Sequence, residues 1–398
     1  MNPDLARLQP YPFEKINALK QGVTPPADKN HIALSIGEPK HTPPTFALDE
    51  IAKQLQGIGS YPVTKGLPAL RQAIVEWNTK RYGLPANSLD AEKNVLPVSG
   101  TREALFAFAQ AVIDRTCSPL VMMPNPFYQI YEGAALLAGA EPYFMNTIQE
   151  TGFIPDFDAV PENIWQRCQL LYICSPGNPT GAVMSIETLQ KIIQLADKHD
   201  FVIASDECYS EIYFDENQPP PGILEAAHKM GRDDFKRCIA FNSLSKRSNL
   251  PGLRSGFVAG DADLIAGFLK YRTYHGCALP PPTQMASIKA WGDEIHVKEN
   301  RALYTKKIDD VYVALSKVMT IPKPEASFYL WPETPIDDTE FARGLFEQQN
   351  ITVVPGQYLS RMAEGSNPGQ NRIRIAMVAP YEECMDAANR MIEYVNSL

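Results

Sequence analysis

The stretch that decides the fold is Phe241–Phe257, FNSLSKRSNLPGLRSGF. A lysine, Lys246, follows Ser-Leu-Ser at the end of an apolar run, and Arg254 lies eight positions later, just before another apolar run. A lysine at the mouth of a buried sheet is suited to imine chemistry with a carbonyl. Hydroxyls and a guanidinium around it are suited to a phosphate. The segment therefore predicts a ligand that carries both an aldehyde and a phosphate.

The composition indicates an ordinary globular protein. The chain has 398 residues, of which 44% are hydrophobic and 21% charged, enough for a large core and two domains. The net charge of −9 is a poor match to nucleic acid, which requires a basic face. The N-terminus lacks the apolar core of a signal peptide, and no apolar run of about 18 residues exists. We therefore expect a cytoplasmic protein without a membrane span.

The cysteines indicate neither disulfides nor a metal site. The seven cysteines form no CxxC pair, and no two histidines have the spacing of a zinc site. Reduced and mostly buried thiols are therefore the expected state, and no metal is predicted.

The middle of the chain alternates strands with helices. The run 170–174 is wholly apolar, as in a parallel strand that is buried on both faces. The run 105–113 has apolar residues at helical spacing. The expected strands are 94–98, 119–123, 170–174, 201–204, 238–241 and 256–259, and a further helix is expected at 186–198. This alternation predicts a mostly parallel sheet with helices on both sides, which binds ligands beyond the carboxyl ends of its strands.

The pattern changes after about residue 285. A long helical region, 286–318, leads to an alternating strand at 327–331, a helix from Thr339 and strands near Ile351 and Ile373. This irregular order predicts a smaller α+β domain. We therefore expect three parts, which are an N-terminal arm with part of the small domain (1–45), a large domain (46–285) and the small domain (286–398).

Polar and reactive side chains follow the expected strands, so the sheet would gather them at one edge. Asp206 is placed to keep a ring nitrogen protonated, and Tyr128 to stack on the ring. Tyr209 and Asn178 are placed to bind a ring hydroxyl. The residues expected around the phosphate are Gly100, Thr101, Arg102, Ser243, Ser245 and Arg254. These are the parts that pyridoxal 5′-phosphate (PLP) requires.

Each of these residues alone has an ordinary explanation. Asp206 is a candidate helix cap or ion-pair partner, the segment after Asn178 a turn, and Tyr128 a half-buried core aromatic. Their joint order along the chain, each at a strand end, favours the PLP site.

The order of motifs resembles the class I and II aminotransferases, the fold-type I, aspartate-aminotransferase-like PLP enzymes. The matching motifs are LSIGEP (34–39), YPVTKGLPALR (61–71), SGTREAL (99–105), PNPFYQIY (124–131), SPGNPTG (175–181), SDECYSEI (205–212), SLSK (243–246), GLRSGF (252–257) and NRIRIA (371–376). They span nearly the whole chain. The resemblance implies an α/β fold, with a mostly parallel seven-stranded sheet flanked by helices in the large domain and a smaller α+β domain.

The resemblance also implies roles for single residues. Lys246 is similar to the Schiff-base lysine, and Asp206 to the partner of the pyridine nitrogen. With Tyr209, these form the expected catalytic set. Tyr61 is similar to a tyrosine that reaches the phosphate of the neighbouring subunit's cofactor, which implies a homodimer.

The substrate is expected to meet three of these positions. Arg372, rather than Arg374, is similar to the arginine that binds the substrate α-carboxylate. Gly37 is similar to a glycine whose backbone faces the substrate, and Asn178 is expected to contact both cofactor and substrate.

One departure from the family narrows the substrate class. After Lys246 the sequence continues Arg247-Ser248-Asn249, where many relatives have small or aromatic residues. This variant resembles the succinyldiaminopimelate aminotransferases of lysine (diaminopimelate) biosynthesis, which exchange an amino group between glutamate and an N-succinylated oxo acid. The candidate residues for the succinyl carboxylate are Lys65, Arg102, Arg247 and Arg272.

Other functions remain as alternatives. Another aminotransferase, such as one for acetylornithine or for aromatic amino acids or alanine, would share Lys246, Asp206 and Arg254, and so would a PLP-dependent C–S lyase. A PLP-binding transcription regulator is disfavoured, because the motifs begin by Leu34 and the chain is acidic. The resemblance further implies cis peptide bonds at Asn125-Pro126 and Asn178-Pro179.

Overall fold

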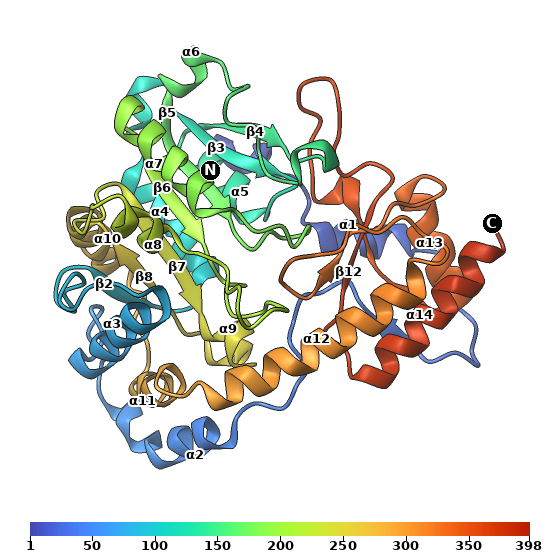
Figure 1. The fold of residues 1–398 in the computed structure, drawn as a ribbon, viewed down its shortest axis with the longest axis horizontal. Coiled ribbons are helices and arrows are strands. Elements are labelled where there is room, and N and C mark those ends of the chain that lie inside the picture. The colour runs from blue at the N-terminus through green and yellow to red at the C-terminus, as the bar shows by residue number, and fades with distance from the viewer.

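A seven-stranded sheet forms the centre of the large domain in the computed structural model, which describes residues 1–398 (Figure 1). Its strand order is β2-β8-β7-β6-β5-β3-β4. The strands are β2 (Val95–Val98), β3 (Leu120–Asn125), β4 (Glu141–Asn146), β5 (Cys168–Cys174), β6 (Val202–Asp206), β7 (Cys238–Ser243) and β8 (Gly256–Gly260). Only β8 runs antiparallel to its neighbours. The predicted mostly parallel, seven-stranded sheet is therefore confirmed.

Helices cover both faces of this sheet, because its central strands are apolar on both sides. Leu171 and Ile173 of β5 pack into one buried cluster, whereas Leu170 and Tyr172 pack into another. The first face is covered by α3 (Pro68–Tyr82), α7 (Ile186–His199), α8 (Ile223–Lys229) and α11 (Pro281–Trp291), and the second by α4 (Thr101–Val112), α5 (Ile130–Leu137) and α10 (Ala262–His275). The remaining helices of the large domain are α2 (Thr45–Lys53), α6 (Glu162–Trp165) and α9 (Leu244–Arg247).

The small domain has a core of its own. It packs helices around a three-stranded sheet of order β11-β12-β9 and a two-stranded β1-β10 pair. The elements are β1 (Ile32–Ala33), β9 (Tyr329–Leu330), β10 (Ile351–Thr352), β11 (Val354–Pro355), β12 (Ile373–Ala376), α1 (Pro12–Leu19), α12 (Ile295–Leu315), α13 (Asp338–Gln349) and α14 (Tyr381–Asn396). Because β1 pairs in parallel with β10, the start of the chain contributes to this domain.

The predicted helical region 286–318 is two helices rather than one. α11 ends at Trp291, and α12 begins at Ile295 and runs from the large domain into the small one (Figure 1). Ala286 and Trp291 pack in the large-domain core. We therefore propose that the domain boundary lies at 292–294 and not at 285.

The expected cis bonds are confirmed at Asn125-Pro126 and Asn178-Pro179, and Ser175-Pro176 is cis as well. No helix combines the length and the apolar character needed to cross a membrane.

Candidate active site

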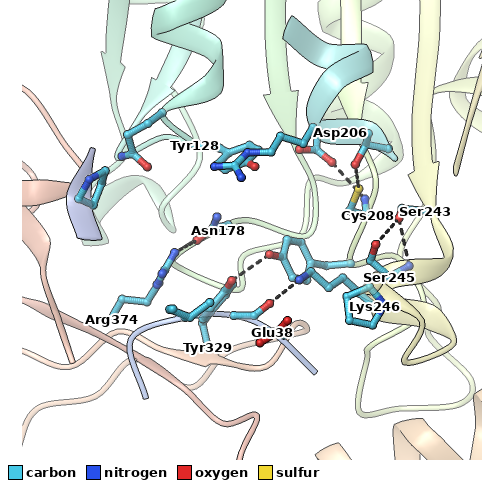
Figure 2. Close-up of a pocket in the computed structure, with 18 of the residues that line it drawn as sticks. Glu38, Tyr128, Asn178, Asp206, Cys208, Ser243, Ser245, Lys246, Tyr329 and Arg374 are labelled. Carbon is cyan, nitrogen blue, oxygen red and sulfur yellow. Dashed lines mark hydrogen bonds between the residues drawn. The ribbon is translucent and has the colours of Figure 1, made fainter. Parts of the chain in front are cut away.

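A pocket of about 640 Å³ lies beyond the carboxyl ends of the sheet strands. Of the residues predicted from the sequence, it is lined by Gly37, Thr101, Arg102, Tyr128, Asn178, Asp206, Tyr209, Ser243, Ser245, Lys246 and Arg254. Figure 2 shows Arg374 and Asn178 across the pocket from Ser243 and Ser245. The structure thus brings together residues as distant in the chain as Gly37 and Arg374.

Lys246 lies on α9, a single helical turn that begins directly after β7. The Ser243 hydroxyl caps this turn by accepting a hydrogen bond from the Ser245 backbone N–H at 3.0 Å. The Lys246 Nζ donates to the carbonyl oxygen of Gly37. Burial lowers the pKa of Lys246 from 10.5 to about 8, and the cations Arg374 and Arg254 act in the same direction. The amine therefore loses its proton more readily than the amine of an exposed lysine does.

Asp206 ends β6 at the floor of the pocket. One carboxylate oxygen accepts a hydrogen bond from the Tyr131 hydroxyl at 2.7 Å, and the other accepts from the Cys208 backbone N–H at 3.3 Å. Burial raises the pKa of Asp206, while both hydrogen bonds lower it. A buried carboxylate with these partners is suited to pair with a protonated ring nitrogen.

The residues predicted to bind a ring hydroxyl face the same space. The hydroxyls of Tyr209 and Tyr329 are 2.9 Å apart, and Tyr209 is buried. The Asn178 side-chain oxygen accepts from Arg374 Nη1 at 2.9 Å. Tyr128 lines the pocket with its ring edge-on to that of Tyr131, at a centroid distance of 5.8 Å.

The phosphate-binding residues meet at the N-terminus of α4. Gly100 is the N-cap residue, with φ of 85°, and an added Cβ would lie 2.2 Å from the Arg254 Nη2 atom. Arg254 makes no ion pair, although it bonds the carbonyl oxygen of Pro251 at 2.8 Å. A helix N-terminus, two serine hydroxyls and a guanidinium without a carboxylate partner fit a phosphate dianion.

The structure corrects the prediction for Arg372. Arg374 lies in β12, is buried and lines the pocket, whereas Arg372 precedes the strand and does not line it. The Arg372 guanidinium is held by Glu333 at 2.7 Å and by the Trp331 carbonyl at 3.1 Å. Side chains two positions apart in a strand point to the same face. The alternation of side chains along a strand therefore gives no basis for choosing between Arg372 and Arg374. The anchor on Glu333 keeps Arg372 away from the pocket.

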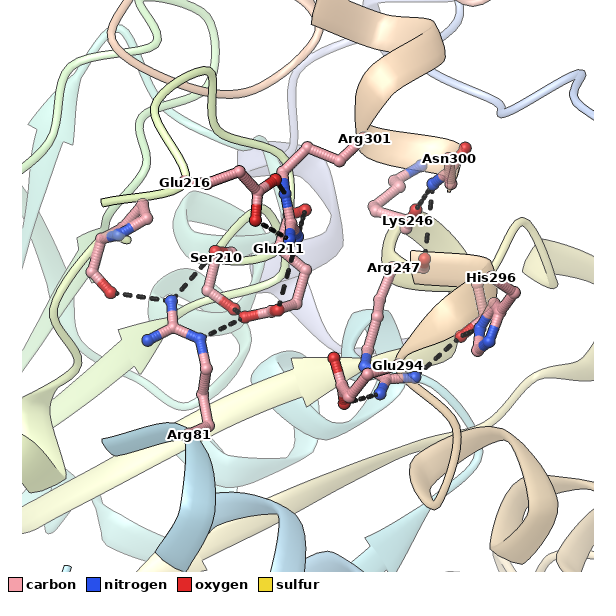
Figure 3. A network of polar contacts seen from close by, with 12 residues as sticks. Arg81, Ser210, Glu211, Glu216, Lys246, Arg247, Glu294, His296, Asn300 and Arg301 are labelled. Carbon is pink, nitrogen blue, oxygen red and sulfur yellow. Dashed lines mark hydrogen bonds and ion pairs between the residues drawn. The ribbon is translucent and has the colours of Figure 1, made fainter. Parts of the chain in front are cut away.

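Three of the four candidates for the succinyl carboxylate lie outside the pocket. Lys65 pairs with Glu92 at 2.7 Å on the surface, and Arg272 pairs with Glu103. Arg247 is fully buried and pairs with Glu294, away from the Lys246 side chain (Figure 3). Arg247 therefore contributes to packing and does not line the pocket, so it is not placed to bind the succinyl carboxylate.

Arg102 is the candidate that does line the pocket. Its Nη2 donates to the Tyr11 hydroxyl at 2.7 Å, and its guanidinium lies 5.2 Å from the centre of the Tyr11 ring. Arg102 makes no ion pair, so its charge is open to an anionic ligand.

Several pocket residues were not predicted from the sequence. They are Tyr11, Pro12, Phe13, Ile36, Glu38, Gln129, Cys208, Pro251, Gly252, Tyr329, Leu359 and Arg374. Cys208 lies inside the SDECYSEI motif and Tyr329 in the alternating strand, so local signals existed for both. No local pattern distinguishes Tyr11 or Phe13, which reach the pocket from the N-terminal arm.

Tyr61 does not line the pocket of its own chain and is fully exposed. Its predicted contact with the cofactor of a neighbouring subunit stays a prediction.

Comparisons with known proteins identify the family. The family model described as "Aminotransferase class I and II" matches residues 29–391. The chain belongs to this family, which is PLP-dependent. It is 32% identical over 393 residues to an LL-diaminopimelate aminotransferase of Maridesulfovibrio salexigens, with 97% of each chain covered.

Solved structures agree with this family. An aminotransferase from Neisseria meningitidis has a TM-score of 0.94 and 47% identity, with 99% of this chain and 100% of that one covered. A Thermus thermophilus chain described as a probable N-succinyldiaminopimelate aminotransferase has a TM-score of 0.82 and 27% identity, with 96% and 99% covered. The predicted aminotransferase family and its PLP cofactor are therefore confirmed.

The pocket fits PLP on its own geometry. It combines the partly buried Lys246, the buried carboxylate of Asp206 and the hydrogen-bond donors around Arg254. We propose that Lys246, Asp206 and Arg254 hold the aldehyde, ring-nitrogen and phosphate ends of the cofactor.

The lowered pKa of Lys246 predicts that this lysine destabilises the cofactor-free protein. Below about pH 8 the lysine is protonated in both folded and unfolded chains, and the full penalty for burying its charge applies. The penalty is lost as the pH rises from about 8 to 10.5. We expect Lys246→Met to stabilise the cofactor-free protein at pH 7 by up to about 3 kcal/mol. Denaturant unfolding at pH 7 and pH 10 measures this difference.

The exposed Lys289 provides a matched control. Lys289→Met removes an ammonium that is exposed to water in the folded protein, so its effect should be within about 0.5 kcal/mol at either pH. If Lys246→Met changed the free energy of unfolding equally at pH 7 and pH 10, the penalty would not come from burying the charged amine.

Proposed function

We propose that the protein transfers an amino group between glutamate and N-succinyl-2-amino-6-oxopimelate, to give 2-oxoglutarate and N-succinyl-LL-2,6-diaminopimelate in lysine biosynthesis. The observation that carries this proposal is the pair of cations in one pocket with Lys246. Arg374 is buried beside Asn178, and Arg102 lies toward Tyr11 of the N-terminal arm. Two cations suit a substrate with a carboxylate at the reacting end and another at its far end.

The relatives support the same substrate class. One is named as an LL-diaminopimelate aminotransferase and another as a probable N-succinyldiaminopimelate aminotransferase. Both names describe amino acids that carry a second polar group far from the reacting amine. We propose that Arg102, which lines the pocket and makes no ion pair, is the second anchor for such a substrate.

Each residue has a defined part in the proposed reaction. Bound PLP supplies an aldehyde that takes up the amino group and a ring that accepts electrons from the substrate Cα. The Lys246 amine, with a pKa of about 8, takes the proton from Cα as a general base. Arg374 orients the substrate by its α-carboxylate, in concert with Asn178. Asp206 keeps the ring nitrogen protonated.

Three other reactions would use the same catalytic residues. They are transamination of free LL-diaminopimelate, transamination of another amino acid such as acetylornithine, and elimination from a C–S substrate. They differ in products, since elimination yields pyruvate and a thiol, whereas transamination of glutamate yields 2-oxoglutarate.

A donor–acceptor panel with the purified, PLP-loaded protein tests the assignment. We expect 2-oxoglutarate-dependent conversion of N-succinyl-LL-2,6-diaminopimelate to exceed that of free LL-diaminopimelate and acetylornithine. Arg102→Ala should raise the KM for the succinylated substrate roughly tenfold, because a charge-assisted contact is lost, and leave the KM for alanine within about twofold. Higher activity with free LL-diaminopimelate would reject the succinylated substrate but keep the aminotransferase assignment.

The two neighbouring arginines give a direct test of the corrected carboxylate site. Arg374→Ala should reduce kcat/KM for every amino acid by about 100-fold or more, because the α-carboxylate loses its bidentate partner. Arg372→Ala should leave kcat/KM within about threefold, since its guanidinium binds Glu333 instead. Steady-state kinetics of both variants with glutamate show which arginine binds the α-carboxylate. A larger loss of kcat/KM in Arg372→Ala than in Arg374→Ala would restore the assignment made from the sequence.

We also propose that the protein is a homodimer in which Tyr61 completes the partner's site. Leu55, Ile58, Tyr61 and Val63 are exposed apolar residues that lie close together in the sequence, and part of this segment lines a surface hollow with Pro280 and Pro281. Mixing Tyr61→Ala subunits with Lys246→Ala subunits should form hybrids with one intact site and restore about a quarter of the wild-type activity. No gain on mixing, or a monomer in sedimentation, would contradict the shared site.

A further inference from the structure

The carboxylate of Asp206 has one side-chain hydrogen-bond donor that comes from outside the pocket lining. This donor is the hydroxyl of Tyr131 on α5, at 2.7 Å from the Oδ2 atom. Tyr131 is fully buried and does not line the pocket, so it approaches the carboxylate from behind. It is therefore placed to act on a ligand only through Asp206.

The Tyr131 ring is fixed by aromatic neighbours. It stacks on Tyr172, with ring centroids 4.6 Å apart and planes inclined by 9°, and it meets Tyr128 edge-on. The Tyr172 hydroxyl donates to the Leu105 carbonyl oxygen at 2.6 Å, which anchors the stack to α4. The Tyr131 hydroxyl consequently has little freedom to leave Asp206.

An uncharged hydrogen-bond donor at this position opposes the effect of burial on the pKa of Asp206. Burial favours the protonated, uncharged form of Asp206, which cannot pair with a protonated ring nitrogen. A hydrogen bond from a phenol favours the carboxylate instead. Burial also raises the pKa of Tyr131 far above its usual value, so the hydroxyl keeps its proton and remains a donor.

We propose that Tyr131 is a positioning residue that holds Asp206 charged and oriented toward the ring nitrogen of the cofactor. The inference rests on the proposed role of Asp206 and extends the site to a residue that touches neither substrate nor cofactor. It also gives a role to both stacked tyrosines: Tyr131 on α5 holds Asp206, and Tyr172 on β5 anchors the Tyr131 ring.

The test compares two nearly isosteric substitutions in the full-length protein. Tyr131→Phe removes the donor to Asp206, and Tyr172→Phe removes a hydroxyl of equal burial that bonds only a backbone carbonyl. Cofactor affinity is measured by titrating cofactor-free protein with PLP and following its absorbance. We expect Tyr131→Phe to weaken PLP binding about tenfold or more, as for a lost hydrogen bond to a charged group. Tyr172→Phe should change it less than about threefold.

Two further measurements separate positioning from packing. In an Asp206→Asn background, Tyr131→Phe should weaken PLP binding by less than about threefold, because no carboxylate remains to be held. With PLP labelled with ¹⁵N in the ring, Tyr131→Phe should move the nitrogen resonance toward the unprotonated value, and Tyr131→His, which keeps a donor, should restore it in part. Equal losses in both backgrounds, or an unchanged resonance, would overturn the proposal.

The outcome is independent of the substrate assignment. If the wild-type protein binds no PLP, the proposed function fails. If the wild-type protein binds PLP and Tyr131→Phe binds it equally well, only the role of Tyr131 fails. Thermal unfolding of each variant checks that the fold is kept.

Discussion

The ion pair of the buried Arg247 with the partly exposed Glu294 fixes the turn that carries the reactive lysine. Arg247 also donates to the Ala290 carbonyl at 2.7 Å and lies over the Trp291 ring at 5.0 Å, so the residue after Lys246 is locked into the large-domain core. Adjacent side chains on one helical turn point in different directions. With Arg247 held inside the core, Lys246 is directed into the pocket, and the cofactor site depends on this anchor.

The same turn connects the pocket to the helix that links the two domains. Asn300 on α12 donates to the Lys246 carbonyl at 3.2 Å and to the Arg247 carbonyl at 3.3 Å. The Lys246 amine in turn contacts Gly37, in the segment that leads from the small domain. Lys246, which lies in the large domain, therefore contacts the helix that links the domains through its backbone and the segment from the small domain through its amine.

Local patterns in the sequence were sufficient for the sheet centre and for the residues at its strand ends. Buried parallel strands are continuous apolar runs, and Asp206 and Lys246 follow such runs directly. The edge strand β4 was not predicted, because Glu141–Asn146 is half exposed and contains proline and asparagine. Contacts between distant segments leave no local pattern in the sequence, as for Tyr11 with Arg102 and for Tyr131 with Asp206. The choice between Arg372 and Arg374 depended on Glu333, a partner 39 positions away.

The backbone conformation of Gly100 and the nearby Arg254 guanidinium restrict which residue type position 100 can accept. A methyl group at Gly100 would overlap the Arg254 guanidinium, and the φ of 85° disfavours every other residue type. The Arg254 guanidinium is the end of a flexible side chain and can shift, whereas the positive φ of Gly100 stays unfavourable to any residue with a Cβ. A saturation library at position 100 should therefore return mostly glycine, and laboratory evolution of new specificity has more room on the Tyr11 and Arg102 side of the cleft.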